Sequence, residues 1–308
     1  MSLAVTEARR ITLPFLGLAL LALASLTAAH AEFPRLDAMR DYRDLTYQGI
    51  YDYPVTLRDG VYEGDPFVPG GLSRPRVQLV EDIHVRGDLD GDGVDEAAVL
   101  LAESAGGSGV MTYLALVAWR DGIPENRDTV LIGDRVQIRS LALDQRELIL
   151  DFIKAGPKDA ACCPTRKTRT IFQLRHGQLV EASSKGRGSV SAKDLEGVAW
   201  RLTHLDRRTE VPEGVLVTLT VEGDRVSGSA GCNRYFGSVR ESGPSELAIG
   251  PLGSTRMACP EPKMETEHRF LKALEKVNGF GFLNGRLALT YQLDEDAGVD
   301  TLLFAPAP

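Results

Sequence analysis

Short apolar runs, broken by glycine and aspartate, recur along most of this chain and constrain its fold more than any other feature. They are rich in Val, Ile, Leu and Tyr and are mostly shorter than a typical helix, so they predict β-strands joined by turns. The first half contains PRVQLVEDIHV, EAAVLLA, GVMTYLALVAW, DRVQIRSLAL and ELILDFIKA, and the second half contains AWRLTHL, VLVTLTVEG, RVSGSAG, LAIGPL, FGFLNGRLALTYQL and TLLFAP. VQLVEDIHV alternates like a half-buried strand, whereas TYLALVAW is apolar enough to be buried on both faces. We expect a mainly β (α+β) protein.

One segment has helical spacing instead. Within EPKMETEHRFLKALEKV, residues 261–277, apolar residues stand at 264, 270, 271, 274 and 277, with prolines just before and Gly279 just after. This pattern predicts a single helix packed on the strands. Gly223-Asp224 and Asn284-Gly285 are hairpin signals on either side of it.

The first 31 residues predict a signal peptide. Arg9 and Arg10 precede the apolar run ITLPFLGLALLALASL, and Ala29 and Ala31 give the small-residue pattern of a cleavage site. A membrane anchor is the alternative, but the run is short for a spanning helix. We expect a periplasmic or secreted protein with no membrane span after cleavage.

Charge and length set two further expectations. Loss of Glu7, Arg9 and Arg10 on cleavage changes the formal net charge from −8 to −9, which disfavours nucleic acid as a partner. At 308 residues the chain is long for one domain. The stretch VEASSKGRGSVSAKD is rich in Ser, Gly and Lys, so we divide the chain into a β-rich module at 32–180, a linker at 181–194 and a second domain at 195–308.

The strongest chemical motif is GDLDGDGVDEAAVLL. Asp88, Asp90 and Asp92 alternate before Gly93, as at the start of a calcium loop, where hard carboxylate oxygens surround one cation. The twelfth position is Val99 and a strand follows, so this is not an EF-hand. It resembles the shorter loop of FG-GAP-type repeats, and the part of the chain around it is similar to uncharacterised secreted bacterial modules. The predicted calcium ligands are the carboxylates of Asp88, Asp90, Asp92 and Glu96 and the carbonyl of Val94.

The alternative is an Asp/Gly hairpin turn that holds no ion. Four carboxylates within nine residues, with Asp95 beside them, repel one another unless a cation is present. This repulsion favours the calcium interpretation, with a structural role for the ion.

The second half resembles a known family. The segments LEGVAWRLTHL, RVSGSAGCNRYFGS and IGPLGSTRMACPEPKMETEHRFLKAL, followed by LNGRLALTY and TLLF, are similar to the META domain, the family of the heat-shock protein HslJ. The resemblance runs from about 195 to 305. It implies a small β-barrel of lipocalin-like topology with one packed helix, in proteins that are often secreted or lipid-anchored and linked to stress, and it implies no enzyme activity.

The four cysteines are Cys162, Cys163, Cys232 and Cys259. An even number in an oxidising compartment favours disulfides. Cys232 and Cys259 lie in the two motifs shared with the META domain, and a bridge between them would stabilise the fold by about 3.5 kcal/mol. Packed free thiols and a nucleophilic Cys232 are the alternatives. Cys162 and Cys163 form a local bridge, bind metal or pair elsewhere, since three connectivities exist.

Together these features predict a secreted or periplasmic, non-enzymatic protein of the envelope-stress type, with one calcium site and an unidentified protein or envelope ligand as its partner. The rival hypothesis is an enzyme: a calcium-dependent hydrolase, or a thiol oxidoreductase that uses Cys162 and Cys163.

Overall fold

The computed structural model describes residues 38–160, 163–294, 296 and 298–307. The predicted signal peptide, residues 1–31, lies outside this part of the chain. Within it, no helix is long and apolar enough to cross a membrane. Contacts join the described residues into one compact unit.

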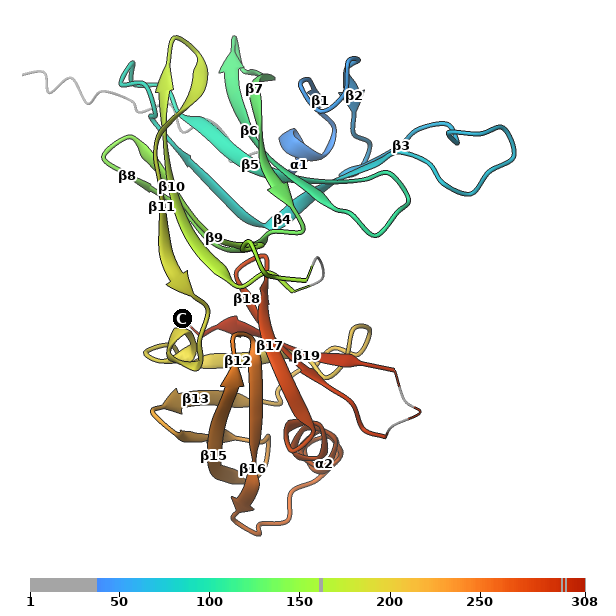
Figure 1. Ribbon diagram of the computed structural model, residues 1–308, viewed down its shortest axis with the longest axis vertical. Coiled ribbons are helices and arrows are strands. Elements are labelled where there is room, and N and C mark those ends of the chain that lie inside the picture. Colours follow the sequence, from blue (N-terminus) through green and yellow to red (C-terminus); the bar gives the residue numbers. More distant parts are fainter. Residues whose placement is uncertain (1–37, 161–162, 295, 297, 308) are drawn as a thin grey trace, which may run out of the picture. The chain divides into compact units, whose positions relative to one another are not determined.

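The first sheet has five antiparallel strands in chain order (Figure 1). The prediction that TYLALVAW is buried is confirmed, because Leu114, Ala115, Leu116 and Val117 are almost inaccessible. VQLVEDIHV alternates between buried and exposed residues along the first part of its strand, as expected. The strands are β3 (Val61–Glu63), β4 (Arg76–Gly87), β5 (Glu96–Ser104), β6 (Met111–Arg120) and β7 (Ile123–Asp134).

Both faces of this sheet are covered. Ala97, Val99 and Leu101 of β5 pack into one cluster with the segment that holds α1 (Ala38–Arg43), β1 (Thr46–Tyr47) and β2 (Val55–Thr56). Ala98 and Leu100, which alternate with them, pack into a second cluster with the second sheet. The second sheet has the order β11-β10-β9-β8. Its strands are β8 (Gln137–Asp144), β9 (Glu147–Lys154), β10 (Arg166–Arg175) and β11 (Gln178–Ser189).

The structure differs from the predicted linker at 181–194. Residues up to Ser189 belong to β11, which pairs with β10, and Ala192–Leu195 form the short 3₁₀ helix η1. Most side chains of β11 are exposed and the strand lies at the edge of its sheet. Pairing with β10 holds this exposed edge strand even though its Gly and Lys residues have low β-propensity, which is why its composition resembles that of a linker.

The C-terminal half is an eight-stranded closed barrel in chain order, closed by pairing of β12 with β19 (Figure 1). This confirms the predicted β-barrel and its packed helix, α2 (Lys263–Leu274). Both hairpin signals lie at turns, between β13 and β14 and between β17 and β18. The strands are β12 (Trp200–His204), β13 (Thr218–Glu222), β14 (Arg225–Ser229), β15 (Arg234–Gly243), β16 (Glu246–Ser254), β17 (Val277–Leu283), β18 (Arg286–Tyr291) and β19 (Asp300–Pro306).

Large side chains fill the barrel. Phe270 of α2 packs edge-on against Tyr235 and Phe304, and all three are almost completely buried. Leucines and valines from the strands complete this core. A packed interior of this kind stabilises the barrel.

Candidate functional site

The acidic loop connects β4 to β5. Gly91 and Gly93 both have a φ of +88°, a conformation that glycine adopts without strain. The carboxylate of Asp88 accepts hydrogen bonds from the backbone N–H groups of both glycines, and Asp92 accepts one from Val94 at 2.7 Å. The loop is therefore a tight turn whose acidic side chains are held by its own backbone.

Three of the four predicted carboxylates converge. Asp88, Asp90 and Glu96 each offer an oxygen, and these oxygens lie within 4.8 Å of one another. Asp92 is not part of this group. Oxygen atoms from several carboxylates at this spacing match the ligand preference of Ca²⁺.

Glu96 is the deepest member of the group. It is only 5 % exposed, and its carboxylate accepts a hydrogen bond from the backbone N–H of Leu89 at 2.9 Å. Burial raises the pKa of Glu96 and the charges of Asp90, Asp92 and Asp88 raise it further, against the opposing effect of the Leu89 hydrogen bond. The three aspartates thus disfavour a charged Glu96.

Two arginines lie close to the loop, and the sequence analysis did not identify either. Arg146, in the turn between β8 and β9, places its guanidinium group so close to Gly91 that a Cβ there would collide with it. Arg86 pairs with Asp95 at 3.3 Å. Asp95 lies just before β5 and two residues from Ala97, the register partner of Arg86, so its pairing with Arg86 depends on residues that are close together near the β4–β5 turn. The approach of Arg146 depends on packing between two sheets, which the sequence pattern does not show.

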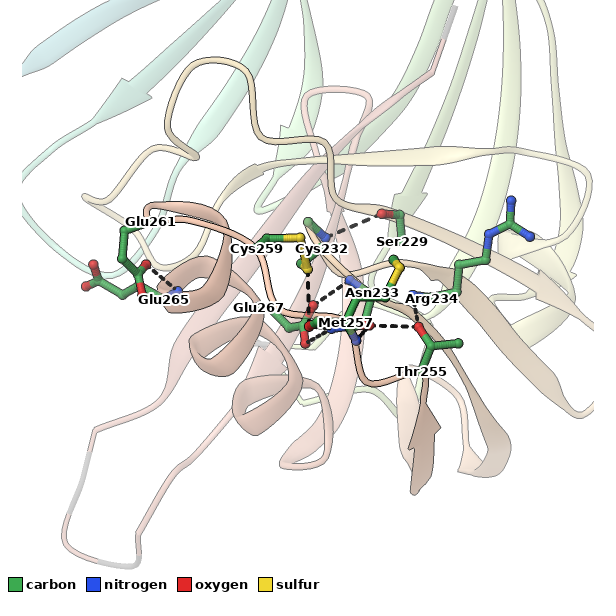
Figure 2. The surroundings of a disulfide bond; sticks show 11 residues. Ser229, Cys232, Asn233, Arg234, Thr255, Met257, Cys259, Glu261, Glu265 and Glu267 are labelled. Atoms are coloured by element: carbon green, nitrogen blue, oxygen red, sulfur yellow. Dashed lines mark hydrogen bonds between the residues drawn. A yellow bond between two sulfur atoms is a disulfide. The ribbon is translucent and has the colours of Figure 1, made fainter.

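Cys232 and Cys259 form a disulfide, with their Cα atoms 5.9 Å apart (Figure 2). Cys163 is also disulfide-bonded, and Cys162 lies outside the described residues. While they are bonded in this way, Cys163, Cys232 and Cys259 offer no thiolate for nucleophilic chemistry.

A buried polar network that the sequence analysis missed lies beside this disulfide (Figure 2). The Asn233 side chain donates to Glu267 at 2.9 Å and to the carbonyl of Met257 at 3.0 Å. Its amide oxygen accepts from the Thr255 hydroxyl and from the Met257 N–H. The backbone N–H of Asn233 donates to the other carboxylate oxygen of Glu267 at 2.6 Å.

This network connects α2 to the β14–β15 turn and to the segment at Thr255–Met257, and it uses every hydrogen-bonding position of the Asn233 side-chain amide. Asn233 and Glu267 are 2 % and 8 % exposed. The available sequence signal was the position of Glu267, three residues before Phe270 on the buried side of α2.

Comparison with known proteins agrees with the C-terminal fold. Residues 193–307 match the family model of the META domain. A solved structure described as the NMR structure of the protein from Burkholderia xenovorans is 30% identical, over 37% of this chain and 85% of that chain, with a TM-score of 0.29. Among curated proteins none matches this chain. The C-terminal barrel is therefore similar in sequence, over its whole length, to the META domain family.

Proposed function

We propose that this protein acts after export as a non-enzymatic binding or structural protein of the HslJ-like, envelope-stress type. The META match over 193–307 is the observation that carries this proposal. The disulfide between Cys232 and Cys259 supports it, because the cysteine in the shared motif serves the fold instead of catalysis. The partner is a protein or another envelope ligand, and the acidic charge argues against nucleic acid. Capture of partners from periplasmic extract is the direct approach to identifying it.

Export to the periplasm or the medium forms part of the proposal. The signal-peptide pattern supports it: two arginines, an apolar run and then Ala29 and Ala31. The Cys232–Cys259 disulfide supports it as well, because disulfides persist in oxidising compartments. N-terminal sequencing of the exported protein should give Glu32 as its first residue. A mature protein that begins upstream of residue 25 would contradict export by this route.

The acidic loop is proposed to bind one structural calcium ion. The convergence of Asp88, Asp90 and Glu96 supports this assignment, with Asp92 and the Val94 carbonyl completing the ligand set. Since the loop lacks the bidentate glutamate of an EF-hand, its affinity belongs at the weak, extracellular end, on the order of 10⁻⁴ M.

Thermal melting in chelator and in calcium tests this site. At a calcium concentration ten times the dissociation constant, binding should stabilise the fold by about 1.4 kcal/mol, because the ion binds only the folded loop. Asp90→Ala should abolish this dependence. Asp95→Ala is the matched control: it removes one charge from the same loop but leaves the converging carboxylates, so the response to calcium should remain. Identical melting of the wild type in chelator and in millimolar calcium would show an ordinary acidic turn.

A count of titratable thiols distinguishes this proposal from the thiol oxidoreductase hypothesis. A thiol oxidoreductase that used Cys162 and Cys163 would cycle between dithiol and disulfide, so native protein prepared under mild reductant would show two titratable thiols. The structural proposal expects no free thiol until the protein is unfolded or strongly reduced.

A further inference from the structure

The described part of the chain forms a cavity of about 480 Å³ away from the acidic loop. Its walls come from strands β8 to β11, from η1 and from the barrel. Charged and aromatic side chains line it, among them Arg139, Lys167, Arg187, Asp194, Trp200 and Phe282. The volume lies within the range of small-molecule sites in proteins.

Ion pairs organise the polar side of this cavity. Asp194 of η1 accepts hydrogen bonds from Lys167 at 2.9 Å to each carboxylate oxygen and from Arg139 at 2.8 Å. Its side chain is only 11% exposed. On the same sheet, Arg169 makes two parallel hydrogen bonds to Asp151. These contacts fix the cationic groups in place before any ligand arrives.

The cavity carries more positive than negative charge. Arg139, Lys167, Arg169 and Arg187 line it together with only two acids, Asp151 and Asp194. Arg187 makes no ion pair with any described residue. This excess of two positive charges stands out in a chain with a net charge of −8. A concave site with an excess of one sign of charge attracts small ions of the opposite sign.

An aromatic wall lies next to these charges. Trp200 and Phe282 both line the cavity, and the Arg139 guanidinium lies 4.6 Å from the centre of the Phe282 ring. The Trp200 indole N–H donates to the carbonyl of Leu195 at 3.1 Å, which fixes the orientation of its ring. The site therefore offers cationic donors on one side and apolar ring edges on the other.

We propose that this cavity binds a small organic dianion of the phosphate monoester class. The phosphate group would interact with Lys167, Arg139 and Arg187, since guanidinium and ammonium groups suit phosphate oxygens. The two excess positive charges match its charge of nearly −2 at neutral pH. The organic group would lie against Trp200 and Phe282. This inference is independent of the calcium site.

Calorimetric titration with three probes in the presence of chelator tests the proposal. Phenyl phosphate carries both features, inorganic phosphate only the charge, and phenol only the ring. We expect saturable binding in the order phenyl phosphate, inorganic phosphate, phenol, with no measurable binding of phenol. Binding of phenyl phosphate should also change the fluorescence of Trp200 in a Trp119→Phe variant.

Two variants and a control locate the site. Arg187→Gln, an exposed position that carries no ion pair, and Lys167→Gln should each weaken phenyl phosphate at least tenfold. Arg175→Gln removes an exposed arginine from the same strand as Lys167, outside the cavity, and should leave binding unchanged. The proposal is overturned if millimolar phenyl phosphate gives no saturable signal, or if Arg175→Gln weakens binding as much as Arg187→Gln does.

Discussion

At the scale of single residues, the motif around Cys232 has two structural roles: Gly231 allows the turn and Asn233 makes the buried hydrogen bonds to α2. Gly231 has a φ of +113°, and a Cβ there would lie 3.1 Å from Val215. Both the conformation and the limited space therefore favour glycine. Asn233 uses its amide to hold α2 against the turn through Met257. The Gly231–Cys232–Asn233 motif, whose cysteine was a candidate nucleophile, therefore has a structural role in this fold.

Asn233→Ala should lower the free energy of unfolding by about 3 kcal/mol. The change leaves the buried Glu267 carboxylate without its side-chain donor, and an unsatisfied buried group costs about 1–3 kcal/mol. It also removes the side-chain partner of the part-buried Met257 N–H and carbonyl. Urea denaturation measures the difference. Asn278→Ala, at an exposed position, is the control and should change the stability by less than about 0.5 kcal/mol. Equal losses of stability in the two variants would show that the Asn233 network does not hold α2 in place.

At the scale of secondary-structure elements, the apolar runs predicted many of the strands but not all. β4, β5, β6, β8 and β9 were predicted, as were most barrel strands. β7, β10 and β15 were missed as strands because polar or charged residues interrupt them. β11 was mistaken for a linker for a related reason: pairing with β10, which sequence does not show, holds its polar backbone in a strand. Helix α1 was also missed, since six residues are too few for a periodic pattern.

The Cys232–Cys259 disulfide connects two such elements, the β14–β15 turn and the segment before α2, across a sequence separation of 27 residues. Replacing both cysteines with serine should lower the free energy of unfolding by about 3.5 kcal/mol, because the unfolded chain gains freedom. Chemical denaturation without reductant measures this. The same variant compared with and without reductant reports the contribution of the remaining disulfide at Cys163. A double variant as stable as the wild type would show that the bridge contributes nothing.

At the scale of the whole molecule, Asp194 links η1 to the second sheet through Arg139 and Lys167. Burial raises the pKa of Asp194, but hydrogen bonds from Lys167 and the Ser191 N–H and the charge of Arg139 outweigh it, so the pKa is lowered. Because the folded pKa lies below the unfolded value of about 3.9, the carboxylate stabilises the fold above that pH. This contribution is lost as the pH falls through the folded pKa.

Asp194→Asn should therefore destabilise the protein by about 2 kcal/mol at pH 7, since it leaves two cations without their shared partner. The difference in free energy of unfolding between variant and wild type should become smaller once the pH falls below about 3.9. Denaturation at a series of pH values measures it. Asp59→Asn is the control. Asp59 pairs with Arg43, but its side chain is 91% exposed, so loss of this ion pair should change the free energy of unfolding little. A gap that stays constant down to low pH would show that the charge of Asp194 is not the cause.

The sequence by itself determined the β class, the helix at α2, the hairpin turns and the acidic loop, because each depends on residues close together in the chain. Local spacing also limited which oxygens meet in the loop: Asp88, Asp90 and Glu96 lie within nine residues. Only the tertiary structure decided that Arg146 approaches Gly91, that Glu267 meets Asn233 and that four cationic side chains surround one cavity. Those contacts join residues far apart in sequence, and they form only where packing between sheets, barrel and helix brings the elements together.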